Sequence, residues 1–323
     1  HWKAFEWDSD ATGATSTRAT IVANAPTAAI KTLVSTPDRH LVFFGTETTI
    51  GTTSTQDDMY IRWSDQESIN ASTSYAPSAT NTAGTQRLAD GTRIVAAIRG
   101  RDAIYVWTDT SLFVMRFVGA PFVFSFQQVG TNCGLIGKNA AVEVDGSAYW
   151  MSENGFFRYT GKLDSLACLV EDYVFDDINT VPRQHIYAGL NNLFGEVTWF
   201  YPGSGAASNN RAVTYNYMDS TPERPVWTVG TLARSAWQDS AVFGKPHATE
   251  YNSSDTTATT NKDHVIGCTD GTTTYFEHEK GLDQIKEDRV NTFNSISYQF
   301  SDLLNQNNLK ANIIGREKTP FSI

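Results

Sequence analysis

Residues 104–113 read IYVWTDTSLF, and this stretch decides the fold class. An aromatic-rich apolar run ends in a Thr-Asp turn, and a second apolar run follows at once. Two such runs around a short polar turn are typical of an antiparallel β-hairpin. The stretch therefore predicts two adjacent strands in an all-β protein.

The same pattern occurs at residues 59–65 (MYIRWSD) and 148–157 (AYWMSENGFF). Their tryptophans follow one another at intervals of 44 and 43 residues, and Trp199 comes 49 residues later. This interval is the length of a four-stranded propeller blade. We predict that one structural position recurs in each blade. The residues predicted to pack between blades are Trp63, Trp107, Trp150, Phe113 and Phe157.

The strands of two successive units can be followed outward from this stretch. They are predicted at residues 93–98, 103–107 and 112–118, and again at 140–144, 147–151 and 156–159. Phe122, Phe124 and Phe126 alternate with smaller residues, so we expect their rings on one face of a fourth strand. Asp145-Gly146 and Asn154-Gly155 supply the positive φ angles that tight hairpins need.

The rest of the chain divides into three parts. Residues 1–40 are interpreted as the N-terminal segment of a longer chain that completes a blade, residues 41–280 as the propeller-like domain of four-stranded blades, and residues 281–323 as strands that begin a further β domain. Both ends are interpreted as cuts through a longer polypeptide. One helix is predicted at 169–178, and long surface loops are predicted at 66–86 and 250–263.

Composition limits the possible functions. The formal net charge of −10 argues against a surface that binds nucleic acid tightly, because such a surface needs clustered Lys and Arg. It allows the wall of a channel through which nucleic acid passes without binding. Cys133, Cys168 and Cys268 are widely spaced and are interpreted as buried free thiols, as expected after folding in a reducing cytoplasm. No apolar run approaches the roughly 18 residues that cross a bilayer.

The sequence lacks the common catalytic motifs. The sequence contains no phosphate-binding Gly-rich loop, no His-Glu-x-x-His and no Gly-x-Ser-x-Gly. Sequence-adjacent carboxylates such as Asp57 and Asp58 point to opposite faces of a strand, so they are poor acid–base couples. We predict no enzyme activity, no cofactor and no metal site. Trp227 and Trp237 lie outside the repeat and are the better candidates for a surface aromatic, although burial is favoured for both.

Five stretches together resemble a known family. They are residues 81–91 (NTAGTQRLADG), 98–102 (IRGRD), 105–109 (YVWTD), 128–137 (QVGTNCGLIG) and 152–161 (SENGFFRYTG). With these residues the chain is similar to the tail nozzle or tail hub proteins of short-tailed, podovirus-like bacteriophages, some of which are known as DNA stabilisation proteins. The resemblance covers residues 41–280 and is strongest at 87–177.

The resemblance implies a structural virion protein of the tail, assembled in the cytoplasm of the host bacterium. It implies a homo-hexameric ring below the portal and adaptor proteins, in contact with tail fibre or needle proteins. Genomic DNA would be retained by this ring and ejected through its lumen without sequence-specific binding. An acidic bore would not trap DNA; the candidates for an acidic lumen or interface are Asp57, Asp58, Asp176 and Asp177.

Two other functions remain open at this point. A propeller domain could bind or hydrolyse host-surface glycan, in which case one pocket should contain two convergent carboxylates and an exposed aromatic side chain. A propeller could also be a scaffold for other proteins, in which case it should be a monomer with no ring contacts.

Overall fold

The computed structural model describes residues 3–7, 18–36, 38–239, 246–251 and 273–277, and this part of the chain is an all-β protein. The strands predicted within residues 281–323, and most of the loop predicted at 250–263, lie outside the described residues. No helix in the described part is long and apolar enough to span a membrane.

Four antiparallel sheets have four strands each, and in each sheet the strands pair in the order in which they occur along the chain. The first two sheets consist of β3 (Lys31–Ser35), β4 (His40–Phe44), β5 (Tyr60–Trp63) and β6 (Gly84–Arg87), and of β7 (Ile94–Arg99), β8 (Ile104–Thr108), β9 (Ser111–Gly119) and β10 (Val123–Thr131). The third and fourth consist of β11 (Ala141–Val144), β12 (Ser147–Ser152), β13 (Gly155–Tyr159) and β14 (Leu163–Leu166), and of β15 (Tyr187–Asn191), β16 (Glu196–Tyr201), β17 (Arg211–Asn216) and β18 (Trp227–Gly230).

Smaller elements complete the described structure. A fifth sheet has three described strands, β19 (Ala236–Gln238), β20 (His247–Tyr251) and β21 (Thr273–Glu277). A two-stranded sheet pairs β1 (Phe5–Glu6) with β2 (Thr20–Ile21). The predicted helix is confirmed as α1 (Glu171–Asp177), and the 3-10 turns are η1 (Thr53–Thr55) and η2 (Arg183–His185).

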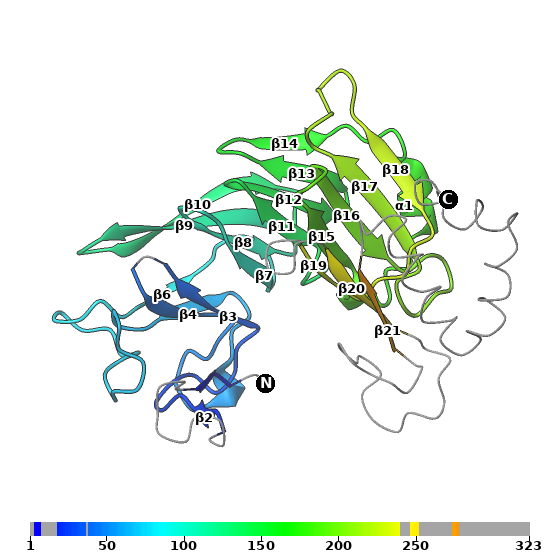
Figure 1. Ribbon diagram of the computed structural model, residues 1–323. Helices are drawn as coiled ribbons and strands as arrows, with labels where there is room; N and C mark the ends of the chain where they lie inside the picture. Colours follow the sequence, from blue (N-terminus) through cyan, green and yellow to red (C-terminus); the bar gives the residue numbers. More distant parts are fainter. Residues whose placement is uncertain (1–2, 8–17, 37, 240–245, 252–272, 278–323) are drawn as a thin grey trace, which may run out of the picture.

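The sheets are arranged as propeller blades around a common axis. The first strands of successive sheets lie against one another, in the series β3–β7, β7–β11, β11–β15 and β15–β19. From this inner series the remaining strands of each sheet extend outward, so that the blades fan around it (Figure 1). The predicted propeller-like repeat of four-stranded units is therefore present in the structure. Because β3 pairs with β4, the predicted boundary at residue 41 divides a hairpin of the first sheet.

Tight hairpin turns connect the strands at the predicted positions. Asp145 and Gly146 join β11 to β12 with φ angles of 50° and 83°. Gly155, which follows Asn154 at the start of β13, has a φ angle of 118°. The Asp-Gly and Asn-Gly pairs therefore set the register of two consecutive hairpins, because residues other than glycine rarely adopt such angles.

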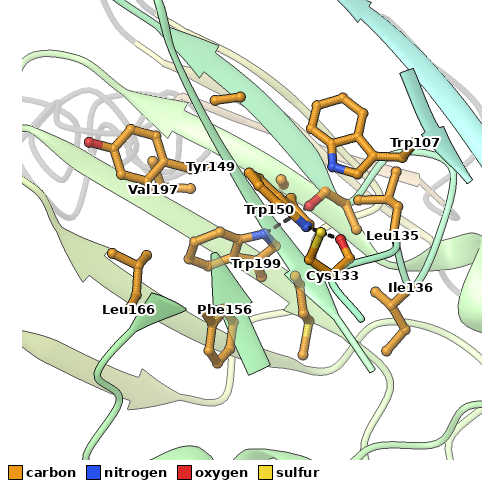
Figure 2. Close-up of a cluster of buried hydrophobic side chains, with 14 of the residues drawn as sticks. Trp107, Cys133, Leu135, Ile136, Tyr149, Trp150, Phe156, Leu166, Val197 and Trp199 are labelled. Carbon is orange, nitrogen blue, oxygen red and sulfur yellow. Dashed lines mark hydrogen bonds between the residues drawn. The ribbon is translucent and has the colours of Figure 1, made fainter. Parts of the chain in front are cut away.

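The largest core cluster joins the second, third and fourth sheets. Trp107, Trp150 and Trp199 lie on the second strands of these sheets and are fully buried. Figure 2 shows Trp150 and Trp199 within this cluster, each with a hydrogen bond from its indole nitrogen. A second cluster packs the first sheet against the second one. Full burial of several aromatic side chains favours the contact between blades, since an aromatic side chain typically removes about 150–250 Å² of surface from water.

Trp63 does not occupy the recurring position that the 44-residue interval predicted. It lies on β5, the third strand of its sheet, whereas Trp107 and Trp150 lie on second strands. In the first sheet the second strand, β4, ends in Phe43 and Phe44. The long connection between β5 and β6 lengthens the first unit, so the equal spacing of Trp63 and Trp107 is a coincidence of loop length.

The three alternating phenylalanines also behave differently from the prediction. Phe124 is buried and Phe126 is half-buried, but Phe122 is 77% exposed. β10 begins only at Val123, and its pairing with β9 shifts register between Val123 and Phe124. Phe122 therefore belongs to the turn before the strand, where the alternation of faces does not apply.

The predicted long loop before β6 is confirmed, but its centre is anchored. Tyr75 is buried against Phe43 with ring centroids 5.6 Å apart. The buried guanidinium of Arg62 donates hydrogen bonds to the carbonyl oxygens of Tyr75 (2.9 Å) and Thr48 (2.8 Å). Burial lowers the pKa of Arg62 from its usual value. One buried cation thus ties two loops to the first sheet.

Candidate functional site along the axis of the sheets

Three neighbouring cavities along the inner strands share one residue, Lys138. Their volumes are about 470, 360 and 490 Å³. The second of them is bounded by residues of all five first strands or of the segments that adjoin them, including Lys31, Arg99, Leu190 and Trp237. This cavity therefore lies on the axis around which the blades are arranged.

Lys138 is held at the axis by the segment that joins the second sheet to the third. Leu135 donates its backbone N–H to Thr108 (3.2 Å), and Ile136 donates its own to Met151 (3.1 Å), so both apolar neighbours are buried between sheets. A Cβ on Gly137 would clash with the carbonyl oxygen of Arg183, so only glycine allows this close approach. Lys138 is consequently the exposed residue of an otherwise buried segment.

A basic residue stands at or shortly before the start of each first strand. Arg93, Lys138, Arg183 and Arg234 precede β7, β11, β15 and β19, and Lys31 begins β3. Arg93, Lys138 and Arg183 line one cavity, and Lys138 and Arg234 line another. The inner ends of the blades therefore gather positive charge at the axis of a protein whose net charge is −10.

Only part of this charge is neutralised by carboxylates. Arg183 pairs with Glu153 at 2.5 Å, and Arg234 lies 3.6 Å from Glu250. Burial lowers the pKa of Arg234, an effect that Glu250 opposes. Among the described residues, Arg93 and Lys138 form no salt bridge. The axis is thus a polar cavity with excess positive charge, which suits an anionic group better than a cation.

Two carboxylates also border the axial cavity, on β11 and after β19. Glu143 accepts a hydrogen bond from the backbone N–H of Gly146 (2.6 Å), and Asp239 accepts one from the N–H of Asn192 (3.3 Å). Trp237 lines the same cavity, but its indole nitrogen donates to the carbonyl of Leu190 (2.7 Å) and its ring packs on Phe200. Each of these three side chains is engaged in joining strands or turns.

The four acidic residues proposed for a lumen or interface separate into two kinds. Asp57 and Asp177 are half-buried and pair with Arg87 (2.7 Å) and Arg211 (3.0 Å) of the same chain. Burial raises the pKa of Asp57, but the hydrogen bonds from Arg87 and from the N–H of Met59 outweigh it and hold that pKa below its usual value. Asp58 and Asp176 are exposed, and only Asp58 lines an axial cavity.

The aromatic residues proposed to pack between blades are in the core, although in two different clusters. Trp107 and Trp150 belong to the large cluster, with Phe157 stacked on Trp150 at 5.7 Å. Trp63 and Phe113 belong to the cluster between the first and second sheets. All five therefore lie in or against core clusters that join neighbouring sheets, but they do not form one repeated position.

Trp227 and Trp237 are half-buried parts of the sheets and do not lie outside the repeat. Trp227 lies on β18, and its indole nitrogen donates to the carbonyl of Ala167 (2.8 Å), beside the third sheet. Its ring contacts Phe156 at 4.8 Å. Trp237 lies on β19. These tryptophans join neighbouring blades and are not an exposed aromatic surface.

The described part of the chain offers neither a cluster of metal ligands nor a reactive thiol. No three His, Cys, Asp or Glu side chains there gather closely enough to hold a metal ion. Burial raises the pKa values of the free thiols of Cys133 and Cys168 to about 11. Thiols with such pKa values are poor nucleophiles at neutral pH. Cys268 lies outside the described residues.

The basic residues at the axis were missed in the sequence. Lys31 begins its first strand and the other four stand one to four residues before theirs, a position that becomes visible only after the units have been aligned on their first strands. Alignment on the tryptophans hides it, because Trp63 lies on a third strand and Trp107 on a second one.

Comparisons with known proteins add little to this geometry. No family model matches the chain, and no curated protein matches it. Among solved structures, the chain is similar to the N-terminal domain of Nup159, with a TM-score of 0.34 and 8% identity over 68% of this chain and 52% of that one. It is also similar to a chain of the S. cerevisiae complex of Dbp5 with Nup159, Gle1, IP6 and ADP, with a TM-score of 0.36 and 10% identity over 76% of this chain and 60% of that one.

The chain thus spans between half and three fifths of the length of these two solved chains. At such TM-scores the likeness carries no argument about function. The propeller-like architecture stands on the sheets and their inner contacts.

Proposed function

We propose that this chain is a structural subunit of the tail of a short-tailed bacteriophage, in a nozzle or hub ring that retains and ejects genomic DNA. In this proposal the subunit is one of six in a homo-hexamer, in contact with portal-adaptor proteins and with tail fibre or needle proteins. It acts in the virion after assembly in the host cytoplasm. The proposal includes no catalytic step and no cofactor.

One observation supports it most: residues that carry the family resemblance hold the connections between sheets against the second sheet. Asp90 accepts hydrogen bonds from the Ser111 hydroxyl and from Nε2 of Gln128 (2.8 Å). Asp109 accepts the N–H of Thr92 (2.8 Å), and Gly134 packs against the backbone of Asp109. A signature made of such contacts is expected of a scaffold, whereas an enzyme family shares the residues of its pocket.

The charge distribution is compatible with a conduit for DNA. The net charge of −10 coexists with basic residues that gather at the axis of the blades, inside the subunit. In a ring of subunits the lumen lies between copies, and there exposed acidic residues would weaken adhesion of phosphates. Of the four acidic candidates, Asp58 and Asp176 have exposed side chains, Asp58 beside an axial cavity and Asp176 on α1.

Electron microscopy of the full-length protein and of the virion would test the proposal. A sixfold ring below a portal, with this chain in its wall, is the expected result. A stable monomer that is absent from the virion would rule the proposal out.

A second candidate function comes from the axial cavity itself. Glu143 and Asp239 border one cavity, as the two carboxylates of a glycan-hydrolysing propeller would, but the aromatic residue beside them, Trp237, is half-buried and hydrogen-bonded to Leu190. Binding and hydrolysis should be measured on host-surface polysaccharide with the wild type and with Glu143→Gln. Hydrolysis that the substitution abolishes would favour this function over the tail ring. If the protein has the third function, that of a scaffold for other proteins, it should be a monomer and should not bind glycan.

A further inference from the structure

The hairpin of β9 and β10 extends beyond the sheet to which it belongs. The two strands have nine residues each and pair as far as Gly119 opposite Val123, whereas β8 pairs with β9 only as far as Met115. Residues 116–125 therefore form a two-stranded arm, which projects at the left of the molecule in Figure 1. A two-stranded hairpin is only marginally stable by itself.

The base of this arm is supported by the first sheet. The ring of the buried His40 lies 5.3 Å from that of Phe124 and 6.0 Å from that of Phe117, measured between centroids. Nδ1 of His40 is 2.7 Å from the carbonyl oxygen of Ser64, which holds the imidazole in place. The arm is thus fixed at its base and held in one direction.

The tip of the arm is apolar and uncovered. We define it as Val118 and Phe122, which are 54% and 77% exposed and lie beyond Phe117, whose ring contacts His40 at the base. Arg116 is the only charged residue between positions 116 and 126, and it forms no salt bridge with a described residue. Clustered exposed apolar side chains of this kind mark interaction sites.

A second apolar surface surrounds α1. We define the α1 surface as Leu169, Tyr173 and Val181, which are 81%, 57% and 86% exposed. Residues 169–181 also contain four acidic residues and no Lys or Arg. Three of these acids, Glu171, Asp172 and Asp176, form no salt bridge within the described part of the chain. The buried Val174 fixes the helix of this surface to the core.

We propose that the arm tip of one copy of this chain docks on the α1 surface of a second copy. Both surfaces carry exposed apolar side chains, and their charges are complementary, with Arg116 at the base of the arm and acidic residues on α1. Complementary potentials favour this pairing over contact between two α1 surfaces, where like charges would repel one another.

The positions of the two surfaces suit a ring. The arm and α1 lie at opposite sides of the molecule (Figure 1). A contact between two different surfaces is heterologous, and it builds a ring when the rotation that it imposes closes after a whole number of copies. The inference rests on the proposed ring function and identifies the surfaces that would build it.

Photocrosslinking of the full-length protein would locate the contact. p-Benzoyl-phenylalanine at position 122 replaces one exposed aromatic ring by another, so the fold should be unaffected. We expect irradiation to produce a covalent dimer whose crosslinked peptide includes residues 169–181. The same probe at Phe194, which is 47% exposed on the fourth sheet, is the matched control and should give no such peptide.

Substitutions would test the energy and the charge of the same contact. Phe122→Ser should weaken self-association at least about tenfold, as expected when an aromatic anchor is lost, whereas Met218→Ser on another exposed apolar residue should not change it. Arg116→Glu should also weaken association, and Asp172→Arg in the partner copy should restore it.

The possible outcomes separate this inference from the proposed function. A ring in which the probe at position 122 crosslinks elsewhere, or in which Phe122→Ser assembles normally, would overturn the docking of the arm while the ring function stands. A wild-type protein that remains monomeric at all concentrations would overturn both.

Discussion

At the scale of the residue, Arg62 shows how a single buried polar group organises several loops. Arg62 is 5% exposed, and its guanidinium donates to carbonyl oxygens in the connections before and after β5, at Thr48 and Tyr75. No carboxylate forms a salt bridge with it in the described structure. The cation is therefore stabilised by backbone dipoles, a role that a single point charge such as lysine fills poorly.

We predict that Arg62→Met destabilises the protein by about 3 kcal/mol, because buried carbonyl groups lose charged donors. Urea unfolding followed by circular dichroism would measure this change. Lys162→Ala, which removes an exposed partner of Asp164, is the control and should change the free energy of unfolding by less than about 1 kcal/mol. Equal effects of the two substitutions would contradict the role given to Arg62.

A comparison of two tryptophans on second strands can isolate the contribution of one hydrogen bond to stability. Trp107 and Trp150 are both fully buried in the same cluster. The indole N–H of Trp150 donates to the carbonyl of Cys133 at 2.7 Å, whereas Nε1 of Trp107 has no hydrogen-bond partner among the described residues.

We predict that Trp150→Phe costs about 1 kcal/mol more than Trp107→Phe. Both substitutions remove the same volume, so the difference reports the lost hydrogen bond. The free energies of unfolding of the two variants would be compared by urea denaturation. A larger loss for Trp107→Phe would show that cavity formation dominates over the hydrogen bond.

At the scale of the element, the segment that joins the second and third sheets is fitted closely to the β8–β9 turn. The N–H of Cys133 donates to Thr110 (3.0 Å), and Gly134 lies directly against the backbone of Asp109. A Cβ on Gly134 would clash with the carbonyl group of Asp109, which cannot move without breaking the turn. This contact sets how closely two blades approach.

We predict that Gly134→Ala destabilises the protein by roughly 2–4 kcal/mol, because the clash involves backbone on both sides. Thermal unfolding would show a clear loss of Tm. Gly230→Ala is a matched control, since a Cβ there meets no other atom and its φ is not positive; it should be neutral or slightly stabilising. A tolerated Gly134→Ala would mean that the linker can shift between the sheets.

At the scale of the whole molecule, burial of ionisable groups links stability to pH. The thiol of Cys133 is fully buried, and burial raises its pKa from about 9 to about 11. Below pH 9 the thiol is protonated in both the folded and the unfolded states, so its full contribution to stability is present. Between pH 9 and 11 the unfolded state loses this proton first, so stability falls as the pH rises.

We predict a loss of roughly 2–3 kcal/mol from Cys133 over this pH range. Urea unfolding at several pH values would be compared between the wild type and Cys133→Ala, which lacks the titrating thiol. The wild type should show the steeper decline above pH 9. Identical slopes would indicate that other groups, such as Tyr201, whose pKa burial raises to about 12, dominate the alkaline transition.

Much of the fold could be predicted from the sequence. The hairpin at residues 104–113, the Asp145-Gly146 turn and the short helix after residue 168 were found because alternation, turn residues and helical periodicity are local properties. The blades of the second and third sheets follow from these. The interval between tryptophans was less reliable, because the loop before β6 changes the length of the first unit.

The sequence by itself determined that this is an all-β protein of repeated hairpins, since the pattern that forms a strand lies within the strand. Only the tertiary structure decided that Lys138 and the basic residues of other blades share one axis, and that Asp57 and Asp177 are paired with arginines. It also decided that the arm tip and the α1 surface lie on opposite sides. These relations join residues far apart in the chain, and they depend on how the blades pack, which no local pattern records.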